Sequence, residues 1–207
     1  MPSVAHSLIA FLAILNPFAL CLYLAGVMQD LPSRDFYQVV LRAAGISLLV
    51  FIVFSLSGED LLTDVLGVRT EAMRAFGGVI FFMVGYQYVV RGYRTTEMLR
   101  GSLEELPSAI ALPFMIGAGT ITQAMLIGRL HGRISSVVIL GLGMALAVAV
   151  IVAFKLLRDR VTGVREQVFD RYVNTLARAN GLLLGSISTE MVVSGIHDLW
   201  FGSTGSG

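Results

Sequence analysis

Charged side chains are scarce in this chain. Asp, Glu, Lys and Arg make up 14% of its 207 residues, whereas hydrophobic residues make up 56%. A soluble domain carries about 25% charged residues, so the composition excludes an ordinary soluble fold and predicts an integral membrane protein. A helical span needs about 20 apolar residues. The chain therefore has the length for roughly six or seven spans, with no room for a soluble catalytic module.

The chain also lacks an excess of charge of one sign, and it lacks pairs of cysteines. Fifteen basic and fourteen acidic residues leave a net charge of +1, which excludes the basic surface of a nucleic-acid-binding protein. Cys21 is the single cysteine, so a disulfide framework and a cysteine-based zinc site are excluded. The three histidines are too scattered for a metal site. We expect no metal, no cofactor, no catalytic residues and no enzymatic activity.

Six apolar segments are long enough to cross a bilayer, and they have to be helical because lipid leaves no other partner for backbone polar groups. They are Val4–Met28, Val39–Ser57, Ala72–Val90, Ser108–Gly128, Ile134–Phe154 and Val173–Ile196. The predicted fold is an all-α membrane protein with one transmembrane domain, residues 1–201. Residues 202–207 are rich in Gly and Ser and are expected to form a flexible tail.

The basic residues are unevenly divided between the two predicted faces. Six spans place both termini on one side, together with Arg69, Arg74, Arg129 and Arg133, while the other eleven basic residues lie on the opposite side. By the positive-inside rule the side with eleven faces the cytoplasm. We therefore expect a multi-pass protein of the inner or plasma membrane with both termini outside.

Two sequence features recur at one displacement. Arg-Ala-Phe-Gly at 74–77 matches Arg-Ala-Asn-Gly at 178–181, 104 residues later, and the same displacement carries Asn16-Pro17 to Thr120-Ile121. Each half contains three spans, so the second half enters the membrane from the opposite side. The sequence predicts two inverted-topology three-helix repeats, residues 1–92 and 107–201, joined by a cytoplasmic loop at 93–106.

The first and fourth spans both contain helix-breaking residues. Pro17 removes a backbone donor and clashes with the preceding turn, and Asn16 can cap a new helix. Pro113 and the segment Gly117-Ala118-Gly119 weaken the fourth span in the same way. Interrupted backbone at membrane depth is tolerated where it is buried in protein or lines a cavity, where a half-helix N-terminus presents N–H groups to an anion. The alternative is that these residues only kink the helices and allow tight packing.

The predicted solute site joins the two interruptions. Its residues are Asn16, Pro17, Gly117, Ala118, Gly119, Thr120, Thr122 and Gln123. A carboxylate is expected at the half-helix N-termini, with side-chain contacts from the two threonines and the glutamine.

Four polar residues within the spans are candidates for coupling or gating, because an intramembrane charge is costly. Counting residues along each predicted span, at about 1.5 Å per residue, places Arg74 at the same membrane depth as Glu190, near the outer face. Glu71, one helical turn before Arg74, is a competing local partner. The same count places Arg178 level with Gln87 near the other face. Structural ion pairing and a role in gating or proton coupling are both open for these residues.

Four ordered motifs make the chain similar to the MarC family, integral membrane proteins that include transporters of small neutral amino acids. The motifs are Ala-Ile-Leu-Asn-Pro at 13–17, Leu-Gly-Val at 66–68 leading to Arg-Ala-Phe-Gly-Gly at 74–78, Ala-Leu-Pro at 111–113 followed by Gly-Ala-Gly-Thr-Ile at 117–121, and Arg-Ala-Asn-Gly-Leu at 178–182 followed by Glu190. The resemblance covers almost the whole chain and implies six helices in a bacterial inner or archaeal membrane. The family usually has proline at the position of Ala118 in this chain. It also usually has a small residue and a second proline after Asn-Pro, where this chain has Phe-Ala-Leu-Cys-Leu at 18–22.

The function expected from these observations is secondary transport of a small neutral solute, such as a small neutral amino acid, by alternating access. The sequence contains no ATP-binding motif, so the driving force is an ion gradient, with H⁺ or Na⁺ as the coupling ion, or the solute gradient itself. A non-transporting scaffold or partner subunit is the main alternative, followed by an intramembrane enzyme. The expected partners are the solute and the lipid bilayer, with no nucleic acid, and a homo-oligomer is left open.

Overall fold

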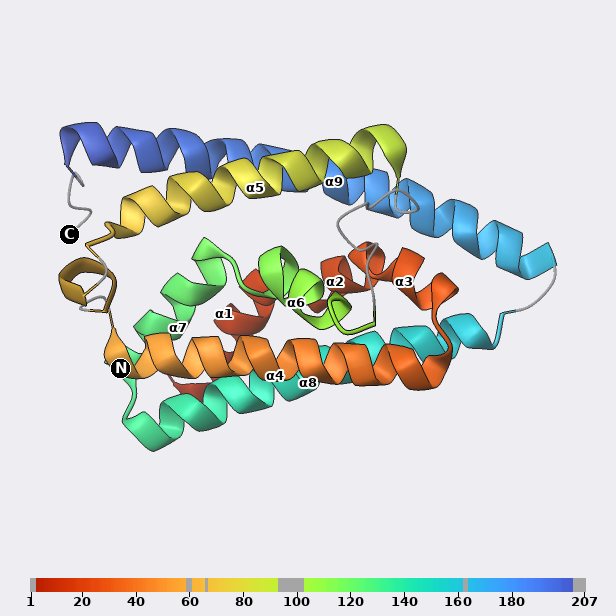
Figure 1. The fold of residues 1–207 in the computed structure, drawn as a ribbon, viewed down its shortest axis with the longest axis horizontal. Coiled ribbons are helices and arrows are strands. Elements are labelled where there is room, and N and C mark those ends of the chain that lie inside the picture. Colours follow the sequence, from red (N-terminus) through yellow and green to blue (C-terminus); the bar gives the residue numbers. More distant parts are fainter. Residues whose placement is uncertain (1–2, 59–60, 66, 93–102, 162–163, 203–207) are drawn as a thin grey trace.

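The computed structural model describes residues 3–58, 61–65, 67–92, 103–161 and 164–202, and all regular structure within these ranges is helical (Figure 1). Most of the predicted loop at 93–106 and of the tail at 202–207 lies outside the described residues. The α-helices are α1 (Val4–Leu15), α2 (Pro17–Tyr23), α3 (Ala25–Asp30), α4 (Ser33–Ser57), α5 (Thr70–Arg91), α6 (Leu106–Ile110), α7 (Ala118–Leu130), α8 (Arg133–Asp159) and α9 (Val164–Phe201). Single π-helical turns lie at Leu61–Val65 and Ala111–Met115.

Four helical segments of the described chain are long and apolar enough to cross a membrane. They are Val4–Tyr23, Ser33–Ser57, Thr70–Arg91 and Arg133–Asp159. The predicted span Ser108–Gly128 is not one of them, because it is divided between α6, a π-helical turn and α7. The predicted span Val173–Ile196 lies inside the 38-residue α9. Asn, Thr, Ser and Gly are interspersed among the apolar residues of this helix, and they lower its mean hydropathy.

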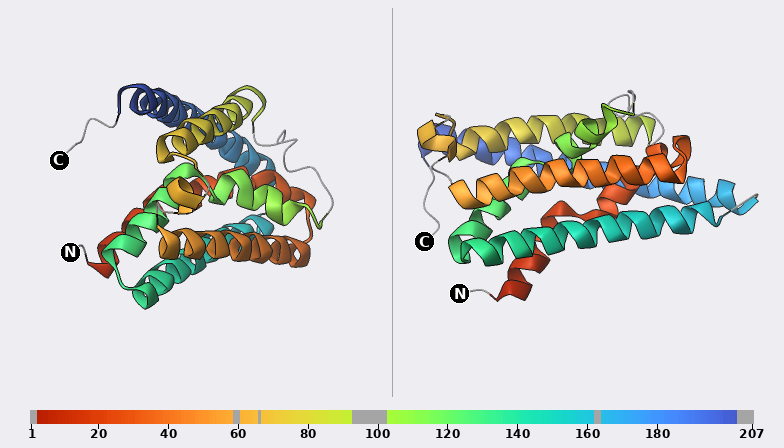
Figure 2. Two further views of the ribbon diagram at one scale, coloured as in Figure 1. Left: turned by 60° about the vertical axis from the view of Figure 1, so that its left-hand side comes forward. Right: turned by 60° about the horizontal axis from the view of Figure 1, so that its bottom comes forward.

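The helices form three layers. The long helices α4 and α8 pack together on one side, and α5 packs against α9 on the other (Figure 2, left). In the view of Figure 1, the short helices α1, α2, α3, α6 and α7 lie between these two pairs. The breaks at Asn16 and Gly117 are thus packed against the continuous helices, where interrupted backbone can be protected from lipid.

The helices α4 and α8 bury the same positions at a displacement of 100 residues. Their buried residues pair one to one, from Phe36 with Ser136 to Ser55 with Lys155. The full sets are 36, 39, 40, 43, 44, 47, 51 and 55 in α4, and 136, 139, 140, 143, 144, 147, 151 and 155 in α8. The two helices therefore present equivalent faces to the short helices between the layers.

Glycines bring α5 and α9 into close contact. A Cβ atom added to Gly85 would lie 2.9 Å from the carbonyl oxygen of Gly181, and one added to Gly78 would lie 2.8 Å from that of Ser188. A Cβ atom on Gly195 would lie 2.8 Å from the backbone nitrogen of Ala75. This is the small-residue packing expected between helices in lipid, where van der Waals contact replaces the hydrophobic driving force.

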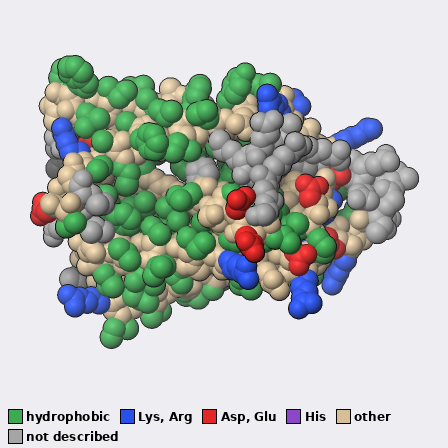
Figure 3. All heavy atoms as spheres, viewed as in Figure 1, with side chains coloured by type: hydrophobic (Ala, Val, Ile, Leu, Met, Phe, Trp, Pro, Cys, Tyr) green, Lys and Arg blue, Asp and Glu red, His purple; other side chains and the backbone are tan. Residues whose placement is uncertain are grey.

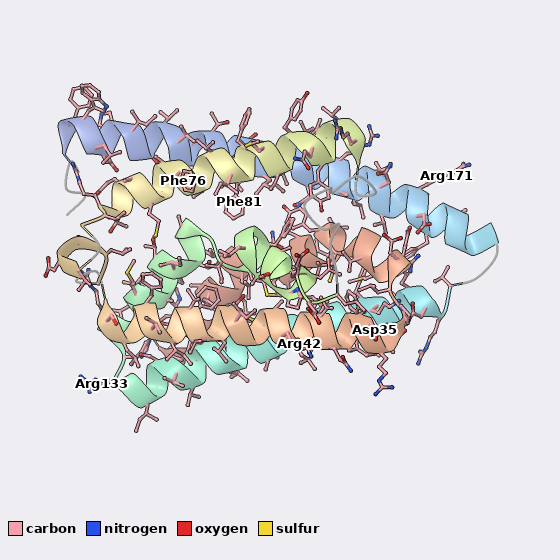
Figure 4. All side chains as sticks on the ribbon, viewed as in Figure 1. Asp35, Arg42, Phe76, Phe81, Arg133 and Arg171 are labelled. Atoms are coloured by element: carbon pink, nitrogen blue, oxygen red, sulfur yellow. The ribbon has the colours of Figure 1, made fainter. Side chains whose placement is uncertain are left out.

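The two termini lie at one end of the molecule, together with the π-helical turn at Leu61–Val65 and the α7–α8 connection (Figure 1). On the face shown in Figure 3, apolar side chains cover the middle, and most charged side chains gather toward the opposite end. Arg133 marks the end with the termini, and Arg171 marks the other (Figure 4). On this face, charged side chains of both signs are therefore concentrated at the end opposite the termini.

A buried lysine fastens the short helix α3 to α8. Lys155 is 3% exposed, and its Nζ donates to the carbonyl of Met28 at 2.7 Å and to Asp159 Oδ1 at 2.8 Å. Ser33 donates to the second oxygen of Asp159 at 2.8 Å, and Arg158 donates to the Met28 carbonyl at 3.1 Å. A cation at the C-terminal carbonyls of a helix is favoured by the helix dipole, and these hydrogen bonds satisfy a charge that burial would otherwise make costly.

Replacing Lys155 by methionine is expected to lower the free energy of unfolding by about 1.5–3 kcal/mol, the range for a lost hydrogen bond to a charged group. The change keeps an unbranched side chain that is one atom shorter, and it removes both hydrogen bonds. Thermal unfolding in detergent measures the effect, with the exposed Arg160→Met at the same end of α8 as the control. Equal unfolding temperatures for the two variants would contradict a stabilising role for Lys155.

Candidate functional site

The first interruption is formed by Asn16, as the sequence predicts. Helix α1 ends at Leu15 and α2 begins at Pro17, and Asn16 between them has a left-handed backbone, with φ 46° and ψ 72°. It is the one non-glycine residue with positive φ in the described chain, and asparagine tolerates this region better than most residues. Its Oδ1 accepts the backbone N–H of Ala19 at 3.1 Å. Asn16 thus ends one helix and caps the next.

The second interruption has two steps. Leu112, directly before Pro113, leaves the helical region with φ −112° and ψ 122°, as expected for a residue that precedes proline. The chain then becomes extended at Ile116 and Gly117 before α7 starts at Ala118. The break thus begins at the proline and ends at the glycine-rich segment.

Thr120 holds the start of α7. Its Oγ1 accepts the N–H of Gly117 at 2.9 Å, and the hydroxyl lies 3.0 Å from the carbonyl oxygens of both Met115 and Gly117, to one of which it donates. Thr120 therefore satisfies backbone groups that the break leaves without helical partners. The following N–H groups, in the first turn of α7, have no acceptor within their own helix.

The two interruptions meet at one cavity of about 380 Å³ between the helix layers. Asn16 lines it from the first break, and Gly117, Gly119 and Thr120 line it from the second. The rest of the wall is mostly apolar and includes Tyr23, Phe81, Phe114, Leu184, Ile187 and Met191. The cavity is largely apolar with a few polar groups on one side, which is the usual character of a small-molecule site.

The other predicted solute-site residues do not line this cavity. Pro17 is the first residue of α2, and Ala118 the first of α7. The hydroxyl of Thr122 donates to the carbonyl of Ala118 at 2.8 Å, within its own helix. Gln123 is half-buried elsewhere on α7. Helical periodicity explains the outcome for Thr122, because a residue two positions after Thr120 points to another face of α7.

Phe81 on α5 is a site residue that the sequence does not reveal. A Cβ atom added to Gly117 would lie 2.8 Å from the tip of the Phe81 ring, so the ring rests directly on the glycine. Phe81 points from α5 toward the short helices (Figure 4). Its helix contains several other apolar residues, and no spacing or motif distinguishes it from residues that face lipid.

Hydrogen bonds around Tyr23 join three helices beside the cavity. Asn180 on α9 donates to the hydroxyl of Tyr23 at 2.8 Å, and the hydroxyl of Tyr88 on α5 donates to the Tyr23 carbonyl at 3.0 Å. The rings of Tyr23 and Phe114 lie 5.3 Å apart, centre to centre. The position of α2 is thus tied to the α5–α9 pair, and Asn180 is the variable residue of the repeated Arg-Ala-x-Gly motif.

The expected pair between Arg74 and Glu190 does not form. Arg74 donates to Asp198 at 2.8 Å, and Glu71 pairs with Arg69 at 3.4 Å. Glu190 is exposed on α9. Asp198 lies eight residues further along α9 than Glu190, which is about 12 Å at 1.5 Å per residue. The membrane depth estimated from the sequence therefore predicted the wrong carboxylate as the partner of Arg74.

The ion pair of Arg74 affects the titration of its partner. Hydrogen bonds from His197 and from Arg74, together with their positive charge, hold the pKa of Asp198 below its usual range. At the other end, Arg178 is exposed beside Gly92, and Gln87 is half-buried. No described hydrogen bond joins these two residues, so the predicted clamp at that end is not formed.

Comparisons with known proteins give the family. The family model described as MarC family integral membrane protein matches residues 1–200. The chain belongs to the MarC family. It is 23% identical to a UPF0056 membrane protein of Pyrococcus horikoshii, with 94% of each chain covered. It is also 23% identical to the UPF0056 inner membrane protein YhgN of Escherichia coli, with 97% of this chain and 98% of that protein covered. No solved structure matches the chain.

The structure explains how this MarC protein accommodates alanine at position 118. Ala118 is the first residue of α7 and follows the extended N-cap residue Gly117. Proline, which the family resemblance leads us to expect there, is favoured at this helical position because its missing N–H costs no intrahelical hydrogen bond. Alanine also fits the position, and it adds one backbone N–H at the start of α7.

We expect Asp198→Asn to lower the unfolding temperature of this MarC protein at neutral pH, because it removes the carboxylate that pairs with Arg74. Since the folded-state pKa of Asp198 lies below its usual value of 3.8, the stabilisation is present above that value and is lost as the pH falls through the lower folded-state pKa. Thermal unfolding at pH 7 and below pH 4 tests this. Glu190→Gln is the control, and an equal effect of both variants at pH 7 would contradict the assignment.

We expect Gly117→Ala to lower the free energy of unfolding by about 1–3 kcal/mol, because the new methyl group displaces the Phe81 ring. Gly119→Ala is the matched control in the same segment, since its Cβ would meet only Ile14, at 3.3 Å. The double variant Gly117→Ala/Phe81→Ala removes the clash, so the two effects should be less than additive in chemical or thermal unfolding. Strict additivity would show that the ring does not rest on the glycine.

Proposed function

We propose that the protein is a secondary transporter that moves a small neutral solute, a zwitterionic amino acid, across the membrane by alternating access. The observation that carries the proposal is that two interrupted helices in the middle layer meet at one cavity through Asn16, Gly117, Gly119 and Thr120. Paired discontinuous helices that converge on one site are a recurring design of secondary transporters. A scaffold protein has no need of a polar site at this depth.

The start of α7 is the proposed site for the carboxylate of the solute. Thr120 occupies the N–H of Gly117, and the next N–H groups are available, with the positive end of the helix dipole behind them. The start of α2 is different, because Pro17 has no N–H and Asn16 already caps Ala19. The carboxylate is therefore assigned to α7, and the amide of Asn16 to the amino group or to a polar side chain.

Alternating access is proposed to follow from an inverted repeat. The equivalent buried faces of α4 and α8, and the placement of one interrupted segment against each of them, support two halves with the same packing. Rocking of one half against the other would then open the cavity to either side in turn. We place both termini outside the inner membrane, because the end with more basic residues would face the cytoplasm.

The coupling ion is proposed to be H⁺ or Na⁺. Glu190 is an exposed carboxylate on α9, within the predicted sixth span, and an intramembrane acid is a candidate proton carrier. Arg74 is engaged with Asp198, which favours a structural role at the outer end. Loss of the pH dependence of uptake in Glu190→Gln would assign proton coupling to this residue.

Uptake of labelled glycine, alanine and serine into proteoliposomes, under imposed proton or sodium gradients, tests the proposal. Asn16→Ala is expected to lower uptake about ten-fold, the effect of losing roughly 1.4 kcal/mol. Asn16→Gly is the matched control, because glycine keeps the left-handed backbone while it removes the amide. Loss in both variants with an unchanged unfolding temperature would assign the amide to the solute and not to its cap on Ala19, whereas loss in Asn16→Ala alone would assign the effect to the backbone.

Absence of flux from well-folded wild-type protein under every gradient would overturn the proposal and favour the scaffold interpretation. The close glycine contacts between α5 and α9 supply a packing role for the Arg-Ala-x-Gly motif in either case. Fluorescence-detected gel filtration of each variant separates a loss of transport from a loss of folding.

A further inference from the structure

We propose that the solute has an apolar side chain larger than a methyl group, and that this side chain enters a second cavity beside the central one. The inference rests on the proposed function and narrows its substrate class. The second cavity is an open pocket of about 530 Å³ between α5 and the interrupted α6–α7 segment, and the exposed side chains of Phe76 and Leu112 form part of its wall. None of its lining residues carries a polar side chain, and they include Met73, Ile80, Leu112 and Ile121.

The two cavities share a wall. Phe81 and Gly117 line both of them, and the Phe81 ring is packed against Gly117. Gly117 also directly precedes the N–H groups to which we assign the carboxylate. A solute held there has its α-carbon next to the shared wall, with polar partners on the side of Asn16 and Thr120 and only apolar groups beyond Phe81.

Size and polarity both favour a large apolar side chain. Glycine, alanine and serine would leave the second cavity unoccupied, and serine would bring a hydroxyl group toward a wall that cannot pair with it. A branched or aromatic side chain would instead transfer hydrocarbon from water to an apolar wall, which gains affinity with each added methylene group. Movement of the single Phe81 ring is the only side-chain change in the shared wall that this placement requires.

The occupant we assign is the side chain of the solute and not a lipid acyl chain. The reason is the continuity of the wall through Phe81 and Gly117 with a cavity that has polar groups. An acyl chain would use the apolar cavity alone, and its occupancy would not depend on the identity of the amino acid.

The test is a competition series on the purified full-length protein. Unlabelled glycine, alanine, valine, leucine and phenylalanine compete against labelled leucine for equilibrium binding in detergent, and against labelled alanine for uptake in proteoliposomes. We expect leucine to compete at least about ten-fold better than alanine, within the range that an apolar pocket can discriminate. Equal competition by glycine, alanine and leucine would overturn this inference and leave the proposed transport standing.

Ile80→Trp fills the second cavity, because Ile80 lines this cavity and not the central one. It should reduce the preference for leucine over alanine about ten-fold or more. Val79→Trp introduces the same side chain at the neighbouring exposed position of α5 and should leave the preference unchanged. An unchanged preference in Ile80→Trp would assign the cavity to lipid and overturn the inference. Absence of both binding and flux for every amino acid would instead overturn the proposed function.

Discussion

The structure depends on how the backbone hydrogen bonds of two broken helices are satisfied where water is scarce. In lipid an unpaired N–H or C=O group costs several kcal/mol, about the range for burying a polar group without a partner, so each interruption needs its own local solution. At the first break, Pro17 has no N–H to satisfy and Asn16 caps Ala19. At the second, the Thr120 hydroxyl accepts the N–H of Gly117 and donates to a nearby carbonyl. These two side chains allow the interruptions to exist in the middle layer, and the central cavity follows from them.

The continuous helices give the interruptions their surroundings. The α4–α8 pair presents matching faces to the short helices, and the α5–α9 pair closes the other side through glycine contacts. Phe81 belongs to α5, the helix that the glycine contacts hold against α9, so we expect its contact with Gly117 to depend on small residues that do not line the cavity. Changes at the glycines of this pair would therefore alter the cavity without contacting any solute.

The sequence predicts the breaks well because proline and glycine act locally. Asn16-Pro17 ends one helix and starts the next, and Pro113 displaces Leu112 from the helical region. The sequence also identifies the membrane class, which the family comparison confirms. It does not identify Phe81, because the importance of an apolar residue in an apolar helix depends on the partner across the layer. It misses Asp198 because this residue lies just beyond the predicted span, outside the set of intramembrane charges from which a partner of Arg74 was chosen.

The repeat displacement shows a second limit of sequence. The two copies of the Arg-Ala-x-Gly motif are displaced by 104 residues, whereas the buried positions of α4 and α8 match at a displacement of 100 residues. Matching positions hold different residues, such as Phe36 and Ser136, because each face fits a different interrupted segment. Equivalent burial is therefore visible in the fold and not in residue identity.

One of these unlike pairs bears on the proposed transport cycle. Lys155 fastens the end of α3 through the carbonyl of Met28, while its counterpart Ser55 has a buried hydroxyl without a described partner and packs its carbonyl against Gly128. Two identical halves would give inward-open and outward-open states of equal energy. Since the contacts at the two ends differ, the two states differ in energy in the absence of solute. On the proposed mechanism, the unlike pair at positions 55 and 155 contributes to this difference in energy, although neither residue lines the central cavity.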